Sequence, residues 1–358
     1  MRGTLDLDLY LDAVGTYLPP AVSAADAVAQ GRYDPADHAD DGYDHVLVED
    51  SRSPAEMAVL AGRAALATAR HTGPVDLVLH GSSYYQGQDF WTPATYVRRE
   101  LVGGTGPAFE VRSASNSGMA ALDLAAAYLA AGPGRAAALI TVADRFALPG
   151  FDRWASDGGV VYADGAAAVL LSRTGGVARV LAVTSSSDPE LESLGRDVDR
   201  FLPAPDPAAG PLDLRGFKAR YLRRAGFDEL RARLWAGLRT NVAATARAAR
   251  VDLAAVDRYL VPNVGRDLLE WEFLEPLGIG VDRTAWDNAR RIGHLGAADQ
   301  FANLADMIER GVLTAGQHVL LIGVGLGFSW TSALLRVEPG DRPGAAPPRP
   351  AHQGGTGH

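Results

Sequence analysis

Short apolar runs of strand length recur along this chain and are separated by segments with helical spacing. Residues 5–17 alternate apolar and polar residues and end at two prolines, which predicts an edge or second-layer strand. Compact apolar runs predict further strands at 75–80, 109–111, 136–143, 162–171, 177–185, 258–262, 318–323 and 328–337. Because strands alternate with helices, the pattern predicts an α/β fold with mixed sheets.

Helical spacing marks the segments between these runs. Ser53 followed by Pro54 predicts the start of a helix that continues to about residue 69. An alanine-rich segment after residue 117 predicts a buried helix, residues 217–249 predict a long amphipathic helical region, and two helices are expected to flank residues 291–299.

Two segments lack any periodicity. Residues 34–50 are acidic and are predicted to form a loop, with no metal site expected because the ligand spacing is unspecific. Residues 188–214 are rich in proline and aspartate, as a surface excursion or cavity cover would be. From residue 338 onward the composition turns to proline, glycine and alanine, which predicts disorder.

The stretch from Phe109 to Leu122 carries the clearest chemical signal. An apolar run ends in small polar residues, and a buried helix follows, so Ser115 lies at a sharp strand-to-helix turn. The first N–H groups of a helix have no partner within the helix and favour negative charge. Ser115 is therefore a candidate nucleophile whose own N–H helps to stabilise an oxyanion. The alternative is that Ser113, Ser115 and Ser117 merely cap the helix.

Composition excludes some classes of function and of catalytic or metal site. The 358 residues carry a formal charge of -9 without a long basic run, which argues against nucleic-acid binding. Five arginines, Arg220, Arg223, Arg224, Arg231 and Arg233, could form a local patch for an acidic carrier protein, although a solvated helix face explains them as well. There is no cysteine, so disulfides, thiolate metal sites and a thiol nucleophile are excluded.

No signal-peptide core and no bilayer-length apolar run is present, so we expect a cytoplasmic protein without membrane partners.

An aromatic, polar loop follows the predicted strand at 75–80. It contains Tyr84, Tyr85 and Trp91, which we interpret as substrate-binding residues, with a subunit interface as the alternative. His80, at the end of the strand, is interpreted as a core histidine.

Five motifs in this order resemble the beta-ketoacyl-ACP synthase III-like family of the thiolase superfamily. They cover nearly the whole chain to Val337: the turn at Ser115, the segment Tyr162-Ala163-Asp164-Gly165-Ala166-Ala167-Ala168-Val169, the segment Val261-Pro262-Asn263, the segment Gly293-His294-Leu295-Gly296-Ala297-Ala298, and the loop Gly325-Leu326-Gly327-Phe328. The resemblance implies a thiolase fold with a duplicated five-layered α-β-α-β-α architecture and a homodimer. It divides the chain into residues 1–174, residues 175–337 and a tail at 338–358. Asp164 and Gly165 are interpreted as turn residues.

The chain departs from the family pattern at the reacting positions. The family has a cysteine nucleophile, a histidine and an asparagine, and these positions are here Ser115, Asn263 and His294. Decarboxylative condensation is therefore in doubt. A serine needs a neighbouring base, and His294, with Asp299 five residues later to hold its tautomer, completes a possible triad.

The resemblance also assigns supporting roles. The N–H groups of Ser115 and Leu326 are the expected oxyanion donors, and Asn263 either donates to the thioester carbonyl or caps a helix.

This pattern looks like the divergent acyltransferase branch of the family, found in antibiotic and other specialised-metabolite pathways. It implies transfer of an acyl group from an acyl carrier protein or coenzyme A thioester to a hydroxyl or amine acceptor, without a cofactor. The alternatives are a serine-type priming synthase that condenses acyl-CoA with malonyl-carrier protein, and a catalytically silent partner of a synthase complex.

Overall fold

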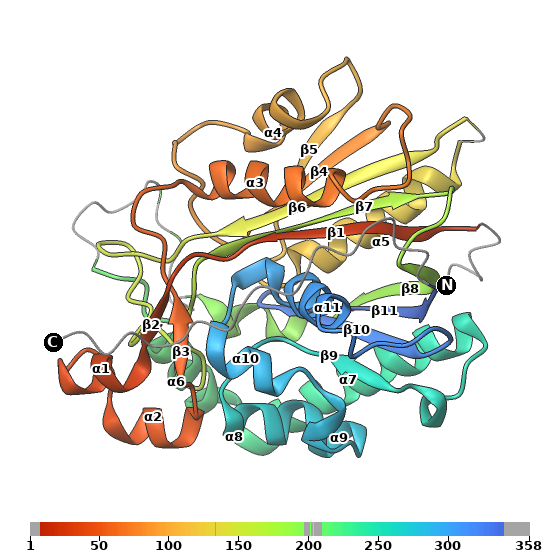
Figure 1. The fold of residues 1–358 in the computed structure, drawn as a ribbon. Helices are drawn as coiled ribbons and strands as arrows, with labels where there is room; N and C mark the ends of the chain where they lie inside the picture. The colour runs from red at the N-terminus through yellow and green to blue at the C-terminus, as the bar shows by residue number, and fades with distance from the viewer. Residues whose placement is uncertain (1–7, 133, 197–200, 202, 204–209, 340–358) are drawn as a thin grey trace, which may run out of the picture.

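The computed structural model describes residues 8–132, 134–196, 201, 203 and 210–339. The strands of its large sheet form two sets, one from each half of the chain (Figure 1). The N-terminal set has the order β5-β4-β6-β7-β1 and consists of β1 (Tyr10–Tyr17), β4 (Leu77–Gly81), β5 (Ala108–Val111), β6 (Ala137–Asp144) and β7 (Gly165–Ser172). Every residue of β6 and β7 is buried, as the apolar runs and the small alanines of β7 predict.

The C-terminal set has the order β8-β11-β10-β9 and consists of β8 (Ala178–Ser187), β9 (Arg258–Leu260), β10 (His318–Gly325) and β11 (Ser329–Val337). The two sets join where β1 meets β8, through the pairs Tyr10↔Arg179 and Leu11↔Ala178. The two sets therefore form one nine-stranded sheet, and the pairing of β1 with β8 is the connection between them.

Helices form the other layers (Figure 1). Between the two strand sets lie α5 (Ser117–Ala130) and α11 (Asp299–Glu309). The outer face of the N-terminal set is covered by α3 (Pro54–Leu66) and α4 (Pro93–Leu101), and that of the C-terminal set by α7 (Phe227–Ala249). This is the predicted layered α/β arrangement.

The core is shared by the two halves. One buried apolar cluster contains Leu77 and Met119 from the N-terminal half together with Phe301 and Val319 from the C-terminal half. The predicted boundary at residues 174 and 175 lies in the turn between β7 and β8. The predicted tail lies outside the described residues from position 340 onward.

The prediction of a loop at residues 34–50 is wrong. The segment contains α2 (Pro35–Asp41) and β3 (His45–Leu47), and β3 pairs with β2 (Ala21–Ser23). Asp34 caps α2 by accepting hydrogen bonds from two backbone N–H groups of its first turn, and proline occupies the first helical position. These are local start signals that act without a hydrophobic period.

The remaining elements are short or lie around the C-terminal set. The predicted helical region at 217–249 is two helices, α6 (Leu214–Ala225) and α7, which meet at Gly226. The others are α1 (Ala24–Ala29), α8 (Arg266–Leu269), α9 (Glu275–Leu277) and α10 (Trp286–Ile292). Among the described residues, no helix has the length and apolar character needed to cross a membrane.

Candidate active site

The ends of parallel strands bring the candidate residues to one place. In the N-terminal set, β4 runs parallel to β5 and β6, so the turn after β5, which carries Ser115, lies at the same edge as Asp144 at the end of β6. In the C-terminal set, β9 and β10 are parallel, and the loops after them carry Asn263 and Leu326. Ligand sites of parallel sheets form where such strands end.

The turn between β5 and α5 holds Ser115 in a fixed position. Ala114 has a left-handed backbone with φ of 47°, which a residue with a side chain adopts only where its surroundings enforce it. Ser117 Oγ accepts a hydrogen bond from Ser113 N (2.8 Å) and donates to the Ala114 carbonyl (2.6 Å), which braces the turn from inside. The N-cap of α5 is Asn116, and its side chain makes no capping bond. The serines are therefore not helix caps.

Ser115, His294 and Asp299 form a hydrogen-bonded chain. Ser115 Oγ lies 2.7 Å from His294 Nε2, and His294 Nδ1 lies 2.5 Å from Asp299 Oδ2. His294 and Asp299 are buried, whereas Ser115 is half-buried. A carboxylate that holds the Nδ1 proton leaves the Nε2 lone pair facing the serine, and there the imidazole can accept the hydroxyl proton.

The backbone of His294 is held by a neighbouring segment. Its N–H donates to the Val161 carbonyl (3.0 Å), and its carbonyl accepts from Ala163 N (2.8 Å). The Tyr162 ring meets the imidazole edge-on, with the ring centroids 5.0 Å apart. The segment that resembles the family's glycine-rich motif thus orients the base.

Asp164 and Gly165 have structural positions. The buried Asp164 carboxylate binds the Arg153 guanidinium in a bidentate manner (3.1 and 2.9 Å) and accepts hydrogen bonds from Phe146 N and Glu49 N. Gly165 begins β7. Neither residue lines the cavity beside Ser115. Their interpretation as turn residues is wrong, because Asp164 directly precedes β7 and Gly165 is its first residue.

Asp299 is the first residue of α11, and its carboxylate accepts three hydrogen bonds. Besides the His294 contact, Oδ2 accepts from Asn263 N (2.7 Å) and Oδ1 accepts from Leu295 N (2.8 Å). Hydrogen bonds to an ionised carboxylate are among the strongest in proteins. The orientation of Asp299, and through it that of the imidazole, is therefore fixed before any substrate binds.

Asn263 lies behind the triad. Its Nδ2 donates to the Gly293 carbonyl (2.9 Å), its Oδ1 accepts from Asn303 Nδ2 (2.7 Å), and its own carbonyl accepts from the Tyr43 hydroxyl (2.7 Å). It does not cap α8, whose N-cap is Gly265. The cavity is lined by its chain neighbours on both sides but not by Asn263 itself. Contact between Asn263 and a thioester carbonyl stays a prediction, whereas its support of the triad is visible.

Leu326 lies in the loop between β10 and β11, beside the nucleophile turn. A Cβ atom at Gly325 would stand 2.1 Å from the Ser113 carbonyl oxygen and 3.0 Å from Asn116 N, so only glycine allows the two backbones to approach this closely. Ser115 and Leu326 line the same cavity. Their role as oxyanion donors stays a prediction.

Sequence reasoning missed Asp144, which ties two loops of the site together. Its Oδ1 accepts from Ser83 N (2.7 Å) and Tyr84 N (2.9 Å), and its Oδ2 accepts from Ala297 N (3.1 Å), in the loop of the triad histidine and aspartate. Burial raises the pKa of Asp144 to about 6, although these three N–H groups act in the opposite direction. A charged residue that ends a fully buried apolar strand is the signal that could have found it.

The three predicted substrate-binding residues are not brought to Ser115. The Tyr84 ring stacks on Phe146, with the centroids 6.0 Å apart. Tyr85 and Trp91 are 48% and 38% exposed. None of the three lines the cavity beside Ser115, and Trp91 lines a second pocket beside α4. Their part in substrate binding stays a prediction.

His80 and two of the five arginines fit the simpler interpretations. His80 is fully buried between Thr141 Oγ1 and Gln86 Oε1, each 2.9 Å away, and burial lowers its pKa to about 4. Arg231 and Arg233 pair with acidic residues of α7 and the preceding region, as on a solvated helix face.

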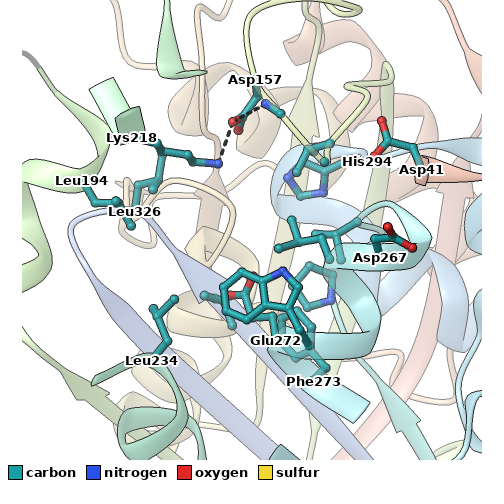
Figure 2. A pocket seen from close by; sticks show the side chains of 18 of the residues that line it. Asp41, Asp157, Leu194, Lys218, Leu234, Asp267, Glu272, Phe273, His294 and Leu326 are labelled. Carbon is teal, nitrogen blue, oxygen red and sulfur yellow. Dashed lines mark hydrogen bonds and ion pairs between the residues drawn. The ribbon is translucent and has the colours of Figure 1, made fainter. Parts of the chain in front are cut away.

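A cavity of about 400 Å³ opens beside Ser115 and His294 (Figure 2). Its lining includes apolar side chains from several elements, among them Leu194, Leu230, Leu234, Trp271, Phe273 and Phe328. The charged side chains of the lining are six acids and one lysine: Asp37, Asp40, Asp41, Asp157, Asp267, Glu272 and Lys218. Within the described part of the chain, no group of three or more His, Cys, Asp or Glu residues is arranged to hold a metal ion.

Two protein-family models match the chain. The model for 3-oxoacyl-[acyl-carrier-protein (ACP)] synthase III matches residues 109–189, and the model for the C-terminal part of that enzyme matches residues 246–337. Ser115 falls within the first match, and His294 and Asp299 fall within the second. The matched regions therefore contain the whole hydrogen-bonded chain.

Similar proteins cover nearly the full length. A mycobacterial beta-ketoacyl-[acyl-carrier-protein] synthase III from Mycolicibacterium paratuberculosis is 26% identical over 92% of this chain and 95% of its own length. The solved structure of ChlB3, described as an acyltransferase, is 33% identical, covers 93% of this chain and 98% of its own, and has a TM-score of 0.86. The 3-oxoacyl-(acyl carrier protein) synthase III from Pseudomonas aeruginosa shares the fold, with 22% identity, 93% and 99% coverage and a TM-score of 0.74.

Proposed function

Because this chain belongs to the beta-ketoacyl-ACP synthase III-like family of the thiolase superfamily, we propose that it is an acyltransferase that works through an acyl-Ser115 ester. The observation that carries the proposal is the contact of 2.7 Å between Ser115 Oγ and His294 Nε2, with Asp299 on the far side of the imidazole. A serine placed in this way is activated as a nucleophile.

In the first half-reaction Ser115 attacks the carbonyl carbon of an acyl thioester. His294 Nε2 takes the hydroxyl proton as the new C–O bond forms, and the N–H groups of Ser115 and Leu326 stabilise the oxyanion. The C–S bond then breaks, and the thiol leaves with the proton held by His294. The product is an ester on Ser115.

In the second half-reaction an acceptor replaces the thiol. His294 takes a proton from the acceptor hydroxyl or amine, which attacks the ester carbonyl. The bond between the acyl carbon and Ser115 Oγ breaks, and Oγ regains a proton from His294. The scheme balances without any metal or organic cofactor.

The arrangement favours this transfer over decarboxylative condensation. Condensation requires donors that hold the thioester oxygen of the malonyl substrate, and Asn263, at one of the family's donor positions, makes a side-chain N–H bond to Gly293. His294, at the other position, bonds Ser115 and Asp299. Both side chains are thus engaged within the protein.

The donor and setting follow from the family. We propose an acyl carrier protein or coenzyme A thioester as donor, and the similarity to ChlB3, described as an acyltransferase, supports acyl transfer. A role in specialised-metabolite biosynthesis such as polyketide or antibiotic formation is also part of the proposal. On α6, the exposed Arg223 and Arg224 lie on the same helix as Lys218 and Leu222, which line the cavity, so a carrier protein could dock there. A cytoplasmic homodimer is part of the proposal.

Intact-protein mass spectrometry tests the covalent step. The protein is mixed with a panel of acyl-CoA and acyl-carrier donors, and Ser115→Ala is treated in parallel. We expect an acyl mass increase on wild type alone, located on the Ser115 peptide. A donor that is turned over without any adduct would contradict the scheme, and release of carbon dioxide from a malonyl donor would favour the priming synthase. A Ser115→Ala variant that still supports product formation in the pathway would favour a silent partner.

A further inference from the structure

Glu272 is a cavity carboxylate that has no counter-ion among the described residues. It lies on the π-helical turn Glu270–Leu274 and lines the same cavity as Ser115. No described residue donates a hydrogen bond to it or forms an ion pair with it. The charges that act on it are Lys218 and Asp157, and Lys218 Nζ is already bound to Asp157 Oδ1 at 2.6 Å (Figure 2).

This placement is unfavourable for the free protein. Glu272 is half-buried and lines the cavity. Burial raises the pKa of its carboxyl to about 7. A charge withdrawn from water costs free energy unless a partner compensates it, and unpaired groups of this kind are concentrated at functional sites. A π-helical turn is also a frequent feature of such sites.

The rest of the cavity lining also favours a positively charged group. The other buried carboxylates of the cavity already have partners inside the protein, since Asp41 accepts from the Tyr33 hydroxyl (2.5 Å) and Asp157 binds Lys218. Trp271, next to Glu272 in the chain, also lines the cavity. Because the face of an indole attracts cations, an acid and an aromatic ring together suit an ammonium group and repel an anion.

We propose that the acyl acceptor carries a protonated amino group that binds Glu272, while a hydroxyl of the same molecule attacks the acyl-Ser115 ester. The inference rests on the proposed acyltransferase function and names its acceptor class, a hydroxyl-bearing amine. An ammonium group paired with a carboxylate has no free lone pair, so the paired nitrogen is a recognition group and the hydroxyl is the nucleophile. Glu272 is therefore a residue that determines acceptor specificity.

The test compares matched acceptors and matched variants. Glucosamine and 2-aminocyclohexanol are each paired with the N-acetyl derivative, which keeps the hydroxyls and removes the positive charge. Binding to the free protein is measured by calorimetry, and loss of the acyl mass from Ser115 is followed in protein first acylated by a thioester donor. Glu272→Gln keeps the side-chain shape and removes its charge. Glu275→Gln, three residues later and exposed, is the control.

We expect at least one amine to bind wild type at least tenfold more tightly than its N-acetyl partner. We expect this preference to persist in Glu275→Gln and to disappear in Glu272→Gln, with the loss in KM rather than in kcat. Equal binding of amine and N-acetyl derivative, a preference that survives in Glu272→Gln, or no binding of either amine would overturn the inference. A thermal melt of each variant shows that it is folded.

The two proposals fail separately. Acylation of Ser115 in wild type without any preference for amines would remove the acceptor assignment and leave the acyltransferase proposal standing. Preferential binding of amines without acylation by any donor would leave Glu272 as an ammonium site and remove the covalent scheme.

Discussion

Asp299 and Glu272 belong to the same active-site region and are held in opposite ways. Asp299 accepts hydrogen bonds from His294 and from two backbone N–H groups, and it is fully buried. Glu272 has no hydrogen-bond or ion-pair partner among the described residues, and it is half-buried and lines the cavity. The first carboxylate is oriented by donors within the protein, whereas the second has no compensating charge bound to it among the described residues.

The number of internal hydrogen bonds distinguishes an acid that orients another side chain from an acid that binds a ligand. A group that must hold an imidazole in one tautomer gains from rigid donors, because its geometry then needs no rearrangement during the reaction. A group that recognises a ligand gains from vacant acceptor sites, because each internal partner would compete with the ligand. The predictions below test this contrast.

The largest effect is expected from Asp299→Asn. An amide in place of the carboxylate removes the negative charge and can favour the wrong imidazole tautomer, so kcat should fall by roughly 10²- to 10⁴-fold. Steady-state kinetics with an active donor and acceptor measure this loss. Asp306→Asn, on the exposed side of the same helix and paired with Arg310 (3.1 Å), is the control and should leave kcat nearly unchanged. A loss shared by both variants would point to a disturbed helix.

A smaller effect is expected from Asp144→Asn. The amide can accept through only one atom, so either the Ser83 and Tyr84 contacts or the Ala297 contact is lost. We expect the free energy of unfolding to fall by about 1–3 kcal/mol and kcat to fall roughly tenfold because the loop of His294 loosens. Denaturant melts and kinetics measure the two effects. Reduced stability with unchanged kcat would mean that Asp144 does not position the triad.

The smallest effect is expected on the stability of Glu272→Gln. The folded-state pKa of Glu272 is raised from the ordinary value of 4.5 to about 7, so ionisation in the folded protein costs stability as pH rises from 4.5 to 7. Glutamine avoids that cost. The variant should be more stable than wild type at pH 8, by at most about 3 kcal/mol, and the advantage should shrink toward zero at pH 4.5.

Thermal or denaturant melts at several pH values measure this difference, with Glu275→Gln as the control. A Glu272→Gln variant that is less stable than wild type at pH 8 would show that the carboxylate has a stabilising partner, which would remove the contrast with Asp299.

Much of the fold could be predicted from local signals, and the triad from the resemblance to a family. Buried strands such as β6 and β7 are continuous apolar runs, and the Ser53–Glu56 capping box starts α3 where the sequence places it. Ser115 and His294 lie in motifs whose order resembles a known family, and Asp299 is close enough in sequence to His294 to be identified from it. The buried strands and the start of α3 depend on short-range chemistry.

Features that depend on tertiary contacts could not be predicted from the sequence. Asp144 receives N–H groups from loops about 60 and 150 positions away in the chain, so nothing beside it announces the role. Glu272 has no hydrogen-bond or ion-pair partner among the described residues, and only the packed cavity reveals this. The aromatic loop predicts a binding role for Tyr84, and the stacking of its ring on Phe146 is a tertiary contact that the sequence does not show.

The contact of Gly325 with the turn that carries Ser115 joins backbones from opposite halves of the chain, with no room for a methyl group between them. Ser115 lies in one half, and His294 and Asp299 lie in the other. If the gene were split at the turn between β7 and β8, acylation of Ser115 would report fragment complementation, since the covalent mark can form only after the two polypeptides have docked.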